Sequence, residues 1–515
     1  MTVLGMLAVG GMEAQNESGS NTATSGSIPT SALRAEGNYW TLDQAAESYA
    51  GGTGTEADPY LIATPEQFIK LCYETYDSEG KGELFYEGKY FKQTADIDLS
   101  AAYSTLLRIG LGGYFAGTYD GGNFVIKGFR QNETNTNEVK GSVMGISPFA
   151  NVKDATIKNV IIEDFEAEFT YPNLYEASIN GGMLVYYATN TTIENCKVSG
   201  DIKLDAAGES CGLFIGGIAG IANNSTINKC HADGTIDLKM NLTGVTTPSE
   251  SYSSAAGISS EIIDQTYILN TTSDVDIKNE TKGDTDYALR TRVAGVTTWT
   301  SDGVFINNCS NTGSLSAWGS NTTVETNFVQ VGGLISYFGD GRLNNCWNAC
   351  KFVSVRNGQM WDFKGLVYDF AGLGMNNCFY DAEFCEIYVT EDLPGSLGAD
   401  TEYMQSKEFV MQLNSQLQEG WLPWQYVEGS YPVLGEASTE DPTASESIAK
   451  SEISFRTVPG AVVITAPEAT QFAAYTFNGA TQATQLIPAG TTTVNLPAGL
   501  YILKIGEETH KVNVK

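Results

Sequence analysis

The sequence predicts an all-β fold, in which a right-handed parallel β-helix (a solenoid) with short capping helices precedes a small antiparallel β-sandwich. The middle of the chain is a series of imperfect repeats of about 32–40 residues, and repeats of this length indicate a stacked architecture. Six repeats each contain a pair of small residues followed by a pair of the Asn-Cys type. The second small residue precedes the cysteine position of the later pair by 13 or 14 residues. Short apolar runs between these two points alternate with polar residues as strands do. Units this small cannot bury a face alone, so they are expected to stack on their neighbours.

The amino terminus predicts export. Residues 1–15 (MTVLGMLAVGGMEAQ) contain a short apolar run and a small residue at Ala14, which resembles the remnant of a secretory signal peptide. Residues 16–36 are rich in Ser, Thr, Asn and Gly and predict a flexible leader. No other apolar run is long enough to cross a membrane, so no membrane span is expected. We therefore expect a secreted or cell-surface protein, associated with the outer membrane.

Composition excludes several function classes. Basic residues number 29 and acidic residues 61, which gives a formal net charge of −32, and such a surface repels nucleic acid. The only two histidines, His231 and His510, leave little room for metal sites or for histidine-dependent nucleophilic catalysis. Cys230 and His231 are neighbours, but neighbours on a strand point to opposite faces, so they form no dyad. Neither a metal nor a cofactor is expected.

The repeats run through a solenoid predicted over residues 37–435. Their small-residue pairs are Gly181-Gly182, Gly216-Gly217, Ala256-Gly257, Ala294-Gly295, Gly332-Gly333 and Lys364-Gly365. Glycine pairs are suited to tight corners and to close approach of the backbone. The copy at Ala256–Ile277 lacks both Gly-Gly and Cys, so an irregular coil is expected there.

Two repeat positions are interpreted as structural. Five cysteines share one position, which holds Val160 and Thr271 in other copies: Cys196, Cys230, Cys309, Cys346 and Cys378. A small inward-facing packing position tolerates such exchanges, which favours buried thiols over the alternative of disulfides or metal ligands. The preceding position is asparagine except at Lys229: Asn159, Asn195, Asn270, Asn308, Asn345 and Asn377. Stacked in register, these amides are expected to form a ladder that stabilises the coils, and a ligand-binding amide row is the alternative.

The two ends of the solenoid predict caps. Thr64-Pro65-Glu66-Gln67 has a capping-box pattern with proline at the first helical position, which predicts a short helix carrying Phe68 and Leu71. Residues 404–417 predict an amphipathic helix, and residues 424–434 a terminal strand. Residues 436–451 predict a linker, and residues 452–515 the β-sandwich module, with Asn478-Gly479 as a hairpin turn.

The repeat, with Gly-Gly-Leu/Ile, a turn and Ile-x-Asn-Cys, resembles the GLUG motif of bacterial surface proteins. The segments 51–62, 90–99 and 115–123 resemble the part that precedes such repeats. The resemblance implies an exported β-helical protein of Bacteroidetes-like bacteria, of a type assumed to be adhesive, and it implies no reaction. The end of the chain, 496–502 and 511–515, resembles carboxy-terminal sorting domains of type IX secretion. It lacks their Asn-Pro signature, so an immunoglobulin-like accessory module stays open.

Three functions are compatible with these observations. The favoured one is a monomeric, non-catalytic, adhesin-like surface protein that binds an extracellular glycan or protein through solenoid loops and faces. Candidate ligand contacts are Trp299, Trp318, Trp347 and Trp361, although each is also an ordinary candidate for buried packing. The second is a polysaccharide lyase or hydrolase, which needs paired carboxylates; among 61 acidic residues, pairs such as Asp362 and Asp369 carry little information, so no catalytic residue is assigned. The third is a structural stalk or spacer.

Overall fold

The computed structural model describes residues 38–77, 80–105, 107–142, 145–243, 251–284, 289–321, 327–372, 374–386, 395–435, 454–458, 460–466, 469–476, 480–506 and 508–514. These residues belong to two compact units, one up to residue 435 and one from residue 454. The expected signal-peptide remnant (1–15), leader (16–36), linker (436–451) and hairpin turn Asn478-Gly479 lie outside the described residues. No helix in the described ranges has the length and apolarity that a membrane crossing requires.

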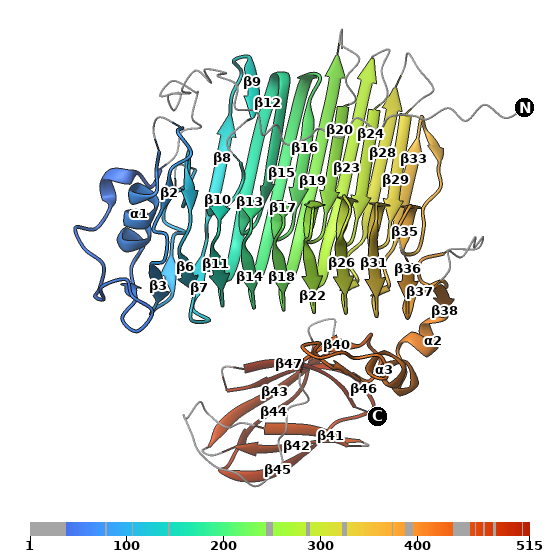
Figure 1. Cartoon of the computed structure of the whole chain (residues 1–515). Coiled ribbons are helices and arrows are strands. Elements are labelled where there is room, and N and C mark those ends of the chain that lie inside the picture. The colour runs from blue at the N-terminus through green and yellow to red at the C-terminus, as the bar shows by residue number, and fades with distance from the viewer. Residues whose placement is uncertain are drawn as a thin grey trace, which may run out of the picture. The chain divides into compact units, whose positions relative to one another are not determined.

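The first unit is a parallel β-solenoid of about seven turns, which confirms the predicted fold class. Equivalent strands from successive coils lie side by side along the stack (Figure 1). Ten short strands form sheet A: β1 (Tyr60–Ile62), β3 (Tyr90–Gln93), β6 (Thr118–Asp120), β11 (Thr156–Lys158), β14 (Thr192–Glu194), β18 (Thr226–Asn228), β22 (Tyr267–Leu269), β26 (Val304–Asn307), β31 (Gly341–Asn344) and β36 (Gly374–Asn376). Nine strands form sheet B: β2 (Leu84–Phe85), β5 (Tyr114–Phe115), β10 (Phe149–Lys153), β13 (Val185–Thr189), β17 (Ala219–Asn223), β21 (Ser259–Ile263), β25 (Thr297–Thr300), β30 (Ile335–Phe338) and β35 (Val367–Phe370).

The remaining strands of the stack form sheet C, in which most coils contribute a long first strand and a shorter second strand. They are β4 (Ile97–Asp98), β7 (Val125–Lys127), β8 (Arg130–Thr134), β9 (Val139–Ser142), β12 (Ile161–Gly182), β15 (Lys197–Glu209), β16 (Gly212–Gly216), β19 (His231–Thr243), β20 (Ser251–Ala256), β23 (Thr272–Asp284), β24 (Leu289–Ala294), β27 (Ser310–Asn311), β28 (Leu315–Asn321), β29 (Asn327–Gly332), β32 (Trp347–Asn348), β33 (Phe352–Arg356), β34 (Gln359–Met360), β37 (Cys378–Asp381) and β38 (Ser396–Ala399). The first and second strands pack face to face, since the inward Asn279 amide donates to the carbonyls of Ser253 (2.8 Å) and Arg292 (3.2 Å).

Each coil runs from sheet A to sheet C, then to sheet B, and back to sheet A. From β15 onward, the long strands of neighbouring coils keep parallel register, for example from Lys197 opposite His231 to Gly208 opposite Leu242, whereas β12 pairs with β15 through two register shifts. Because the register is kept, an inward position in one coil stacks on the same position in the next, and the apolar core continues along the stack.

Asparagine is used at the corners because it tolerates a left-handed backbone. At the corner between sheets A and C, Asn195 has φ +52° and Asn308 +56°, and Lys229, the exception in sequence, has φ +54°. At the corner between sheets B and A, Asn190 and Asn224 have φ +48° and +44°. Among residues with a side chain, Asn adopts this conformation more readily than most.

The small pairs mark the corner between sheets C and B, where backbones of successive coils come close. A Cβ atom placed on Gly333 would lie 1.9 Å from the carbonyl oxygen of Gly365 in the next coil. No side chain fits in that space, so glycine is required by close approach rather than by positive φ at this corner.

The coil around Ala256–Ile277 is regular, so the expectation of irregularity is wrong. Ser259 pairs with Ala219 and Thr297, and Tyr267 pairs with Thr226 and Phe305, as in other coils. The extra length is absorbed in the corner, which has three residues (264–266) where the preceding coil has two (224–225). The nine cysteines are buried and unpaired by disulfides in the described structure.

Helices lie at both ends of the stack (Figure 1). At the amino-terminal end are η1 (Leu42–Gln44) and α1 (Pro65–Glu74), whose N-cap Thr64 accepts from the backbone N–H of Gln67 and whose Phe68 and Leu71 are buried. At the other end lie α2 (Thr401–Met404), α3 (Lys407–Asn414), β39 (Trp424–Gln425) and β40 (Val433–Leu434). The helix expected over 404–417 is present but shorter: α3 begins only at Lys407, because Ser406 caps it by accepting from Phe409 N–H, and it ends at Asn414. The single strand expected over 424–434 is wrong, because its two ends pair with each other as antiparallel strands.

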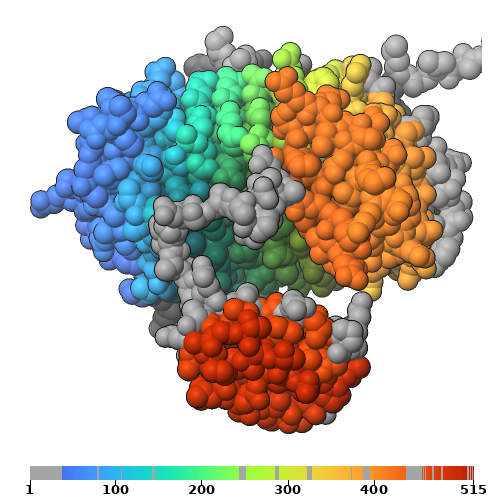
Figure 2. Space-filling view, turned by 90° about the horizontal axis from the view of Figure 1, so that it is seen from below, coloured from blue at the N-terminus to red at the C-terminus, as the bar shows by residue number. Residues whose placement is uncertain are grey.

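This terminal segment folds back over the side of the later coils, as the orange surface in Figure 2 shows. The amide of Asn270 donates to Gly420 O (3.0 Å) and accepts from Leu422 N–H (2.8 Å), and the Asn308 amide donates to Leu422 O (2.8 Å). The corner asparagines therefore also hold the terminal segment.

The second unit consists of two antiparallel sheets, as predicted. One contains β41 (Ser454–Val458), β42 (Ala461–Ala466) and β45 (Gly490–Asn495), and the other β44 (Thr481–Ile487), β43 (Thr470–Thr476), β46 (Gly499–Ile505) and β47 (Glu508–Val514). Its separate core includes Val462, Ile464, Phe472 and Leu503.

Candidate ligand-binding face

The four tryptophans singled out in the sequence do not lie together. Trp347 is 1% exposed and packs against Trp424 at 5.6 Å between ring centroids, so it belongs to the terminal core. Trp318 lies half-buried on β28 of sheet C, beneath the Lys278 ammonium at 5.6 Å. Trp361 is 39% exposed and carries the Arg356 guanidinium at 4.1 Å from its ring centroid. Trp299 is half-buried on β25 of sheet B.

Trp299 belongs to a row of side chains that crosses sheet B. Strand pairing places these residues in one line across successive coils, and we call them the Trp299 row: Ile221, Glu261, Trp299, Tyr337 and Asp369. The Trp299 and Tyr337 rings stack, with centroids 6.4 Å apart and planes 10° apart. Both rings are partly exposed, so they present a continuous aromatic surface to solvent.

Sequence reasoning missed Tyr337 and Glu261, although the sequence contains a signal for them. Each member of the Trp299 row stands four residues after the second residue of its small pair, for example Tyr337 after Gly333. Because that distance is fixed, the row could have been read directly from the aligned repeats.

The coil that carries Trp299 also carries two arginines on the second strand of sheet C. Arg290 stands between Tyr252 and Phe328 in the ladder, and its guanidinium lies 5.9 Å and 4.6 Å from their ring centroids. Arg292 lies 5.0 Å from the Tyr252 centroid and donates from Nε to Gln330 Oε1 at 2.9 Å. Aromatic rings thus contact both guanidinium groups, and a hydrogen bond also holds that of Arg292.

Glu261 is, with Asp369, one of the two acidic members of the Trp299 row. It stands between Ile221 and Trp299 in the ladder. Burial raises the pKa of its carboxyl group to about 7, and the positive charge of Arg292 acts in the opposite direction. A carboxyl group with this pKa is partly protonated near neutral pH, so it can donate as well as accept a hydrogen bond.

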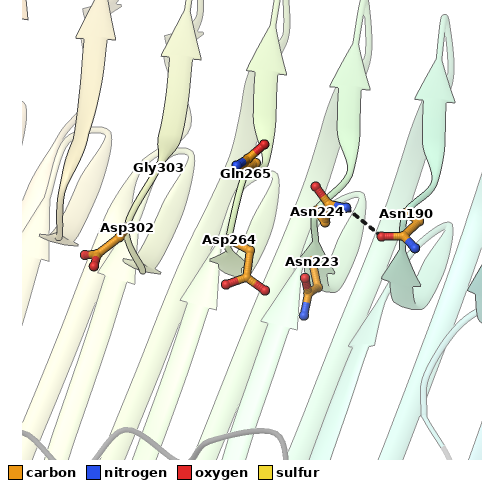
Figure 3. Close-up of a pocket in the computed structure, with 7 residues that line it drawn as sticks. All are labelled: Asn190, Asn223, Asn224, Asp264, Gln265, Asp302 and Gly303. Atoms are coloured by element: carbon orange, nitrogen blue, oxygen red, sulfur yellow. Dashed lines mark hydrogen bonds between the residues drawn. The ribbon is translucent and has the colours of Figure 1, made fainter.

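A polar hollow begins where the sheet B strands end (Figure 3). Its side chains come from successive corners between sheets B and A, and it is lined by Asn190, Asn223, Asn224, Asp264, Gln265, Asp302 and Gly303. The Asn224 amide donates to Asn190 Oδ1 at 2.7 Å. Trp299 precedes Asp302 by three residues, which separates their backbones by at most roughly 10 Å. An aromatic surface and a set of hydrogen-bonding groups therefore lie side by side.

Within the described ranges, no group of three or more His, Cys, Asp or Glu side chains is placed to hold a metal ion.

A scan against protein-family models finds no match, and a search of curated proteins finds none either. Among solved structures, the chain is similar to a proposed immunoglobulin A1 protease from Bacteroides ovatus, with 18% identity and a TM-score of 0.42 over 75% of this chain and 95% of that one. It is also similar to a chain named IgA1 protease, with 14% identity and a TM-score of 0.40 over 75% of this chain and 26% of that one. Both are named as enzymes, which contradicts the expectation that this chain is not an enzyme, and that expectation is not retained.

Proposed function

We propose that this chain is an exported β-solenoid that binds extracellular glycans through the face of sheet B centred on Trp299. The observation that carries the proposal is the stacked, partly exposed Trp299–Tyr337 pair beside a hollow lined by amides and carboxylates. Sugar rings pack their C–H faces against aromatic rings, while side-chain amides and carboxylates bond sugar hydroxyls. A face with both kinds of group fits an oligosaccharide.

The scaffold supports such a site because it is rigid. Both aromatic rings stand on strands of sheet B that are paired on each side, so binding orders little that is not already ordered. Successive coils repeat at roughly 4.8 Å. A linear saccharide that runs along the stack would therefore meet equivalent positions of successive coils.

A glycan fits this face better than a protein partner does. Protein interfaces have an apolar centre that is depleted of charged groups. The Trp299 row instead includes Glu261 and Asp369, and the neighbouring hollow is lined by Asp264 and Asp302. These polar groups suit hydroxyl recognition.

Export and surface location belong to the same proposal. The apolar run within residues 1–15 supports passage through a secretion system, and the resemblance to GLUG proteins supports a cell-surface location. The second unit would then serve as a sorting or accessory module.

A glycan array probed with the labelled full-length protein tests the proposal, and isothermal titration measures the affinity of each glycan that is retained. We expect Trp299→Ala to weaken binding about tenfold, since an aromatic contact is worth about 0.5–1.5 kcal/mol beyond the area that it buries. Trp318→Ala is the matched control, because it removes a half-buried tryptophan from another sheet, and it should leave affinity unchanged. Absence of any retained glycan, or equal effects of the two substitutions, would refute the proposal.

A further inference from the structure

A second exposed aromatic surface lies on sheet A. Strand pairing places Tyr267 of β22 beside Phe305 of β26, and Phe305 beside Arg342 of β31 (Figure 1). The Tyr267 and Phe305 rings stack, with centroids 5.1 Å apart and planes 6° apart. Tyr267 is 42% exposed, and Phe305 is partly exposed. Two nearly parallel rings on neighbouring strands therefore form a flat apolar platform that is open to solvent.

An unpaired arginine stands next to this platform. The Arg342 side chain is exposed, and within the part of the chain that the structure describes its guanidinium group has no hydrogen bond, ion pair or aromatic contact. All of its N–H donors are therefore available to a ligand. Because coils repeat at roughly 4.8 Å, the backbones of Tyr267 and Arg342 lie roughly 10 Å apart. A sugar ring that lies on the platform is thus within reach of the long Arg342 side chain.

The other outward positions of these three strands are uncharged. They hold Leu269, Asn307 and Asn344, and the Asn344 amide donates to Asn307 Oδ1 at 2.7 Å. This bond uses one donor of Asn344 and one lone pair of Asn307, so the two amides have further donors and acceptors for hydroxyl groups. No carboxylate stands among the outward residues of β22, β26 and β31, in contrast to the Trp299 row.

Acidic residues precede these strands at the corner between sheets B and A. They are Asp264, Asp302 and Asp340, and none of them forms an ion pair with Arg342 in the described structure. Because these carboxylates repel an anion, an anionic group bound by Arg342 is expected on the side of Asn344, away from the corner.

We propose that this face of sheet A is a second saccharide site, which takes an acidic sugar. The sugar ring lies on Tyr267 and Phe305, and Arg342 binds its carboxylate or sulfate group. Aromatic rings accept the C–H face of a sugar, and a planar guanidinium group matches the paired oxygens of either anion. In a chain with a formal net charge of −32, an unpaired arginine on strands without outward carboxylates gives local charge complementarity. The site does not depend on the Trp299 row, because it uses other residues on another sheet.

Titration of matched saccharides into the full-length Trp299→Ala protein tests the inference, because this background lacks the main ring of the other face. The carboxylate arm compares tetragalacturonate with its methyl ester, and the sulfate arm compares a sulfated with an unsulfated dextran oligosaccharide. We expect at least one acidic form to bind about tenfold more tightly than its neutral counterpart, as a charge-assisted hydrogen bond allows. The preference should fall as salt rises.

Substitutions in the same background locate the site. Arg342→Gln should abolish the preference and leave the affinity for the neutral form unchanged, and Tyr267→Ala should weaken both forms. Lys278→Gln removes a cation that lies over Trp318 on sheet C, and Tyr73→Ala removes a 58% exposed tyrosine from α1. These two controls should leave every affinity unchanged. The melting temperature of each variant is measured beside its affinity.

The outcomes separate this site from the proposed function. The second site is refuted if the Trp299→Ala protein binds none of these saccharides, if no acidic form is preferred, if Arg342→Gln keeps the preference, or if Tyr267→Ala has no more effect than Tyr73→Ala. The proposed function then still stands on the effect of Trp299→Ala in the otherwise unchanged chain. If Trp299→Ala alters no affinity while Tyr267→Ala and Arg342→Gln act as expected, the proposed function fails and the second site stands.

Discussion

Asn308 shows how one side chain can join neighbouring coils and the terminal segment. Its amide nitrogen donates to Asn270 Oδ1 and to Leu422 O, both at 2.8 Å. Its oxygen accepts from Asn345 Nδ2 at 2.8 Å and from Trp424 Nε1 at 2.6 Å. Aspartate lacks the donors and serine lacks the reach, so only an amide side chain of this length satisfies all four groups while its backbone is left-handed.

Asn308→Ala is expected to destabilise the solenoid by about 3–5 kcal/mol, because it leaves several buried groups without partners at about 1–3 kcal/mol each. Urea unfolding followed by circular dichroism measures the change.

Two further variants separate the contributions. Asn308→Gly keeps the left-handed backbone accessible and should recover about 1 kcal/mol relative to alanine. Asn195→Ala removes bonds to Asn159 (2.8 Å) and Asn123 (3.3 Å) at a partly exposed corner, and it should cost only about 1–2 kcal/mol. Equal losses at positions 195 and 308 would contradict the bridging role of Asn308.

Glu261 predicts a pH dependence of stability. Burial raises the pKa of its carboxyl group from 4.5 to about 7 in the folded chain. Between these values the unfolded chain has released the proton while the folded chain retains it, so the contribution of Glu261 to stability falls as pH rises from 4.5 to about 7. The Glu261→Gln variant has no carboxyl group at this position and lacks this pH-dependent loss. Its free energy of unfolding, measured relative to that of wild type, should therefore be higher at pH 8 than at pH 5.

Chemical unfolding at both pH values gives the comparison, with the exposed Glu163→Gln as control. A Glu261→Gln difference that is the same at pH 5 and pH 8 would show that this carboxyl group has an ordinary pKa.

At the scale of elements, the terminal segment caps the stack through its own small core. Trp347 on β32 and Phe379 on β37 supply the solenoid side of this core, and Phe409 on α3 and Trp424 on β39 supply the segment side. The Trp347 and Trp424 rings lie 5.6 Å apart, and the Phe379 and Phe409 rings 5.1 Å apart. The segment thus covers apolar side chains that the last coils would otherwise expose.

Trp424→Ala is expected to cost about 3–5 kcal/mol, typical of removing a buried aromatic side chain. In a stacked architecture each coil contacts only its neighbours, so the loss should be local. Hydrogen exchange should become faster in α3, β32 and β37 and remain unchanged in β11 and β14.

The exposed Trp361→Ala is the control, and it should change neither stability nor exchange at the capped end. Uniformly faster exchange along the whole chain would show that the coils unfold as a single cooperative unit.

At the scale of the whole molecule, the aligned repeats were sufficient to predict the stack. The spacing from the small pair to the Asn-Cys position reflects strands and corners of fixed length, and it survives even where Thr271 replaces cysteine. The role of Trp347 could not be predicted in this way, because its burial depends on Trp424, which lies far along the chain. The helix break at Ser406 could have been anticipated from its capping chemistry, whereas the return of the terminal segment to Asn308 depends on packing between distant residues.

The cysteines provide a measure of how the whole solenoid opens. All nine are buried, and they are distributed from Cys72 in α1 to Cys385 near the last coil. Burial limits the access of reagents to all nine thiols. It also raises the pKa of the thiols of Cys72, Cys196, Cys346 and Cys350, and raises the pKa of Cys211 to about 12, which disfavours the reactive thiolate at these positions. We expect no reaction with a thiol reagent in the native protein and complete reaction after denaturation.

The order of labelling under mild denaturant then follows from the architecture. Coils at the ends of a stack have one neighbour instead of two, so they open at lower free energy than central coils. Cys385 should therefore be labelled before Cys230, as measured by mass spectrometry of peptides after timed labelling. Trp424→Ala should speed labelling of Cys378 and Cys385 and leave Cys196 unchanged, since its effect is confined to the capped end. Labelling of Cys230 before Cys385 would contradict opening from the ends, and would place the weakest coil in the centre of the stack.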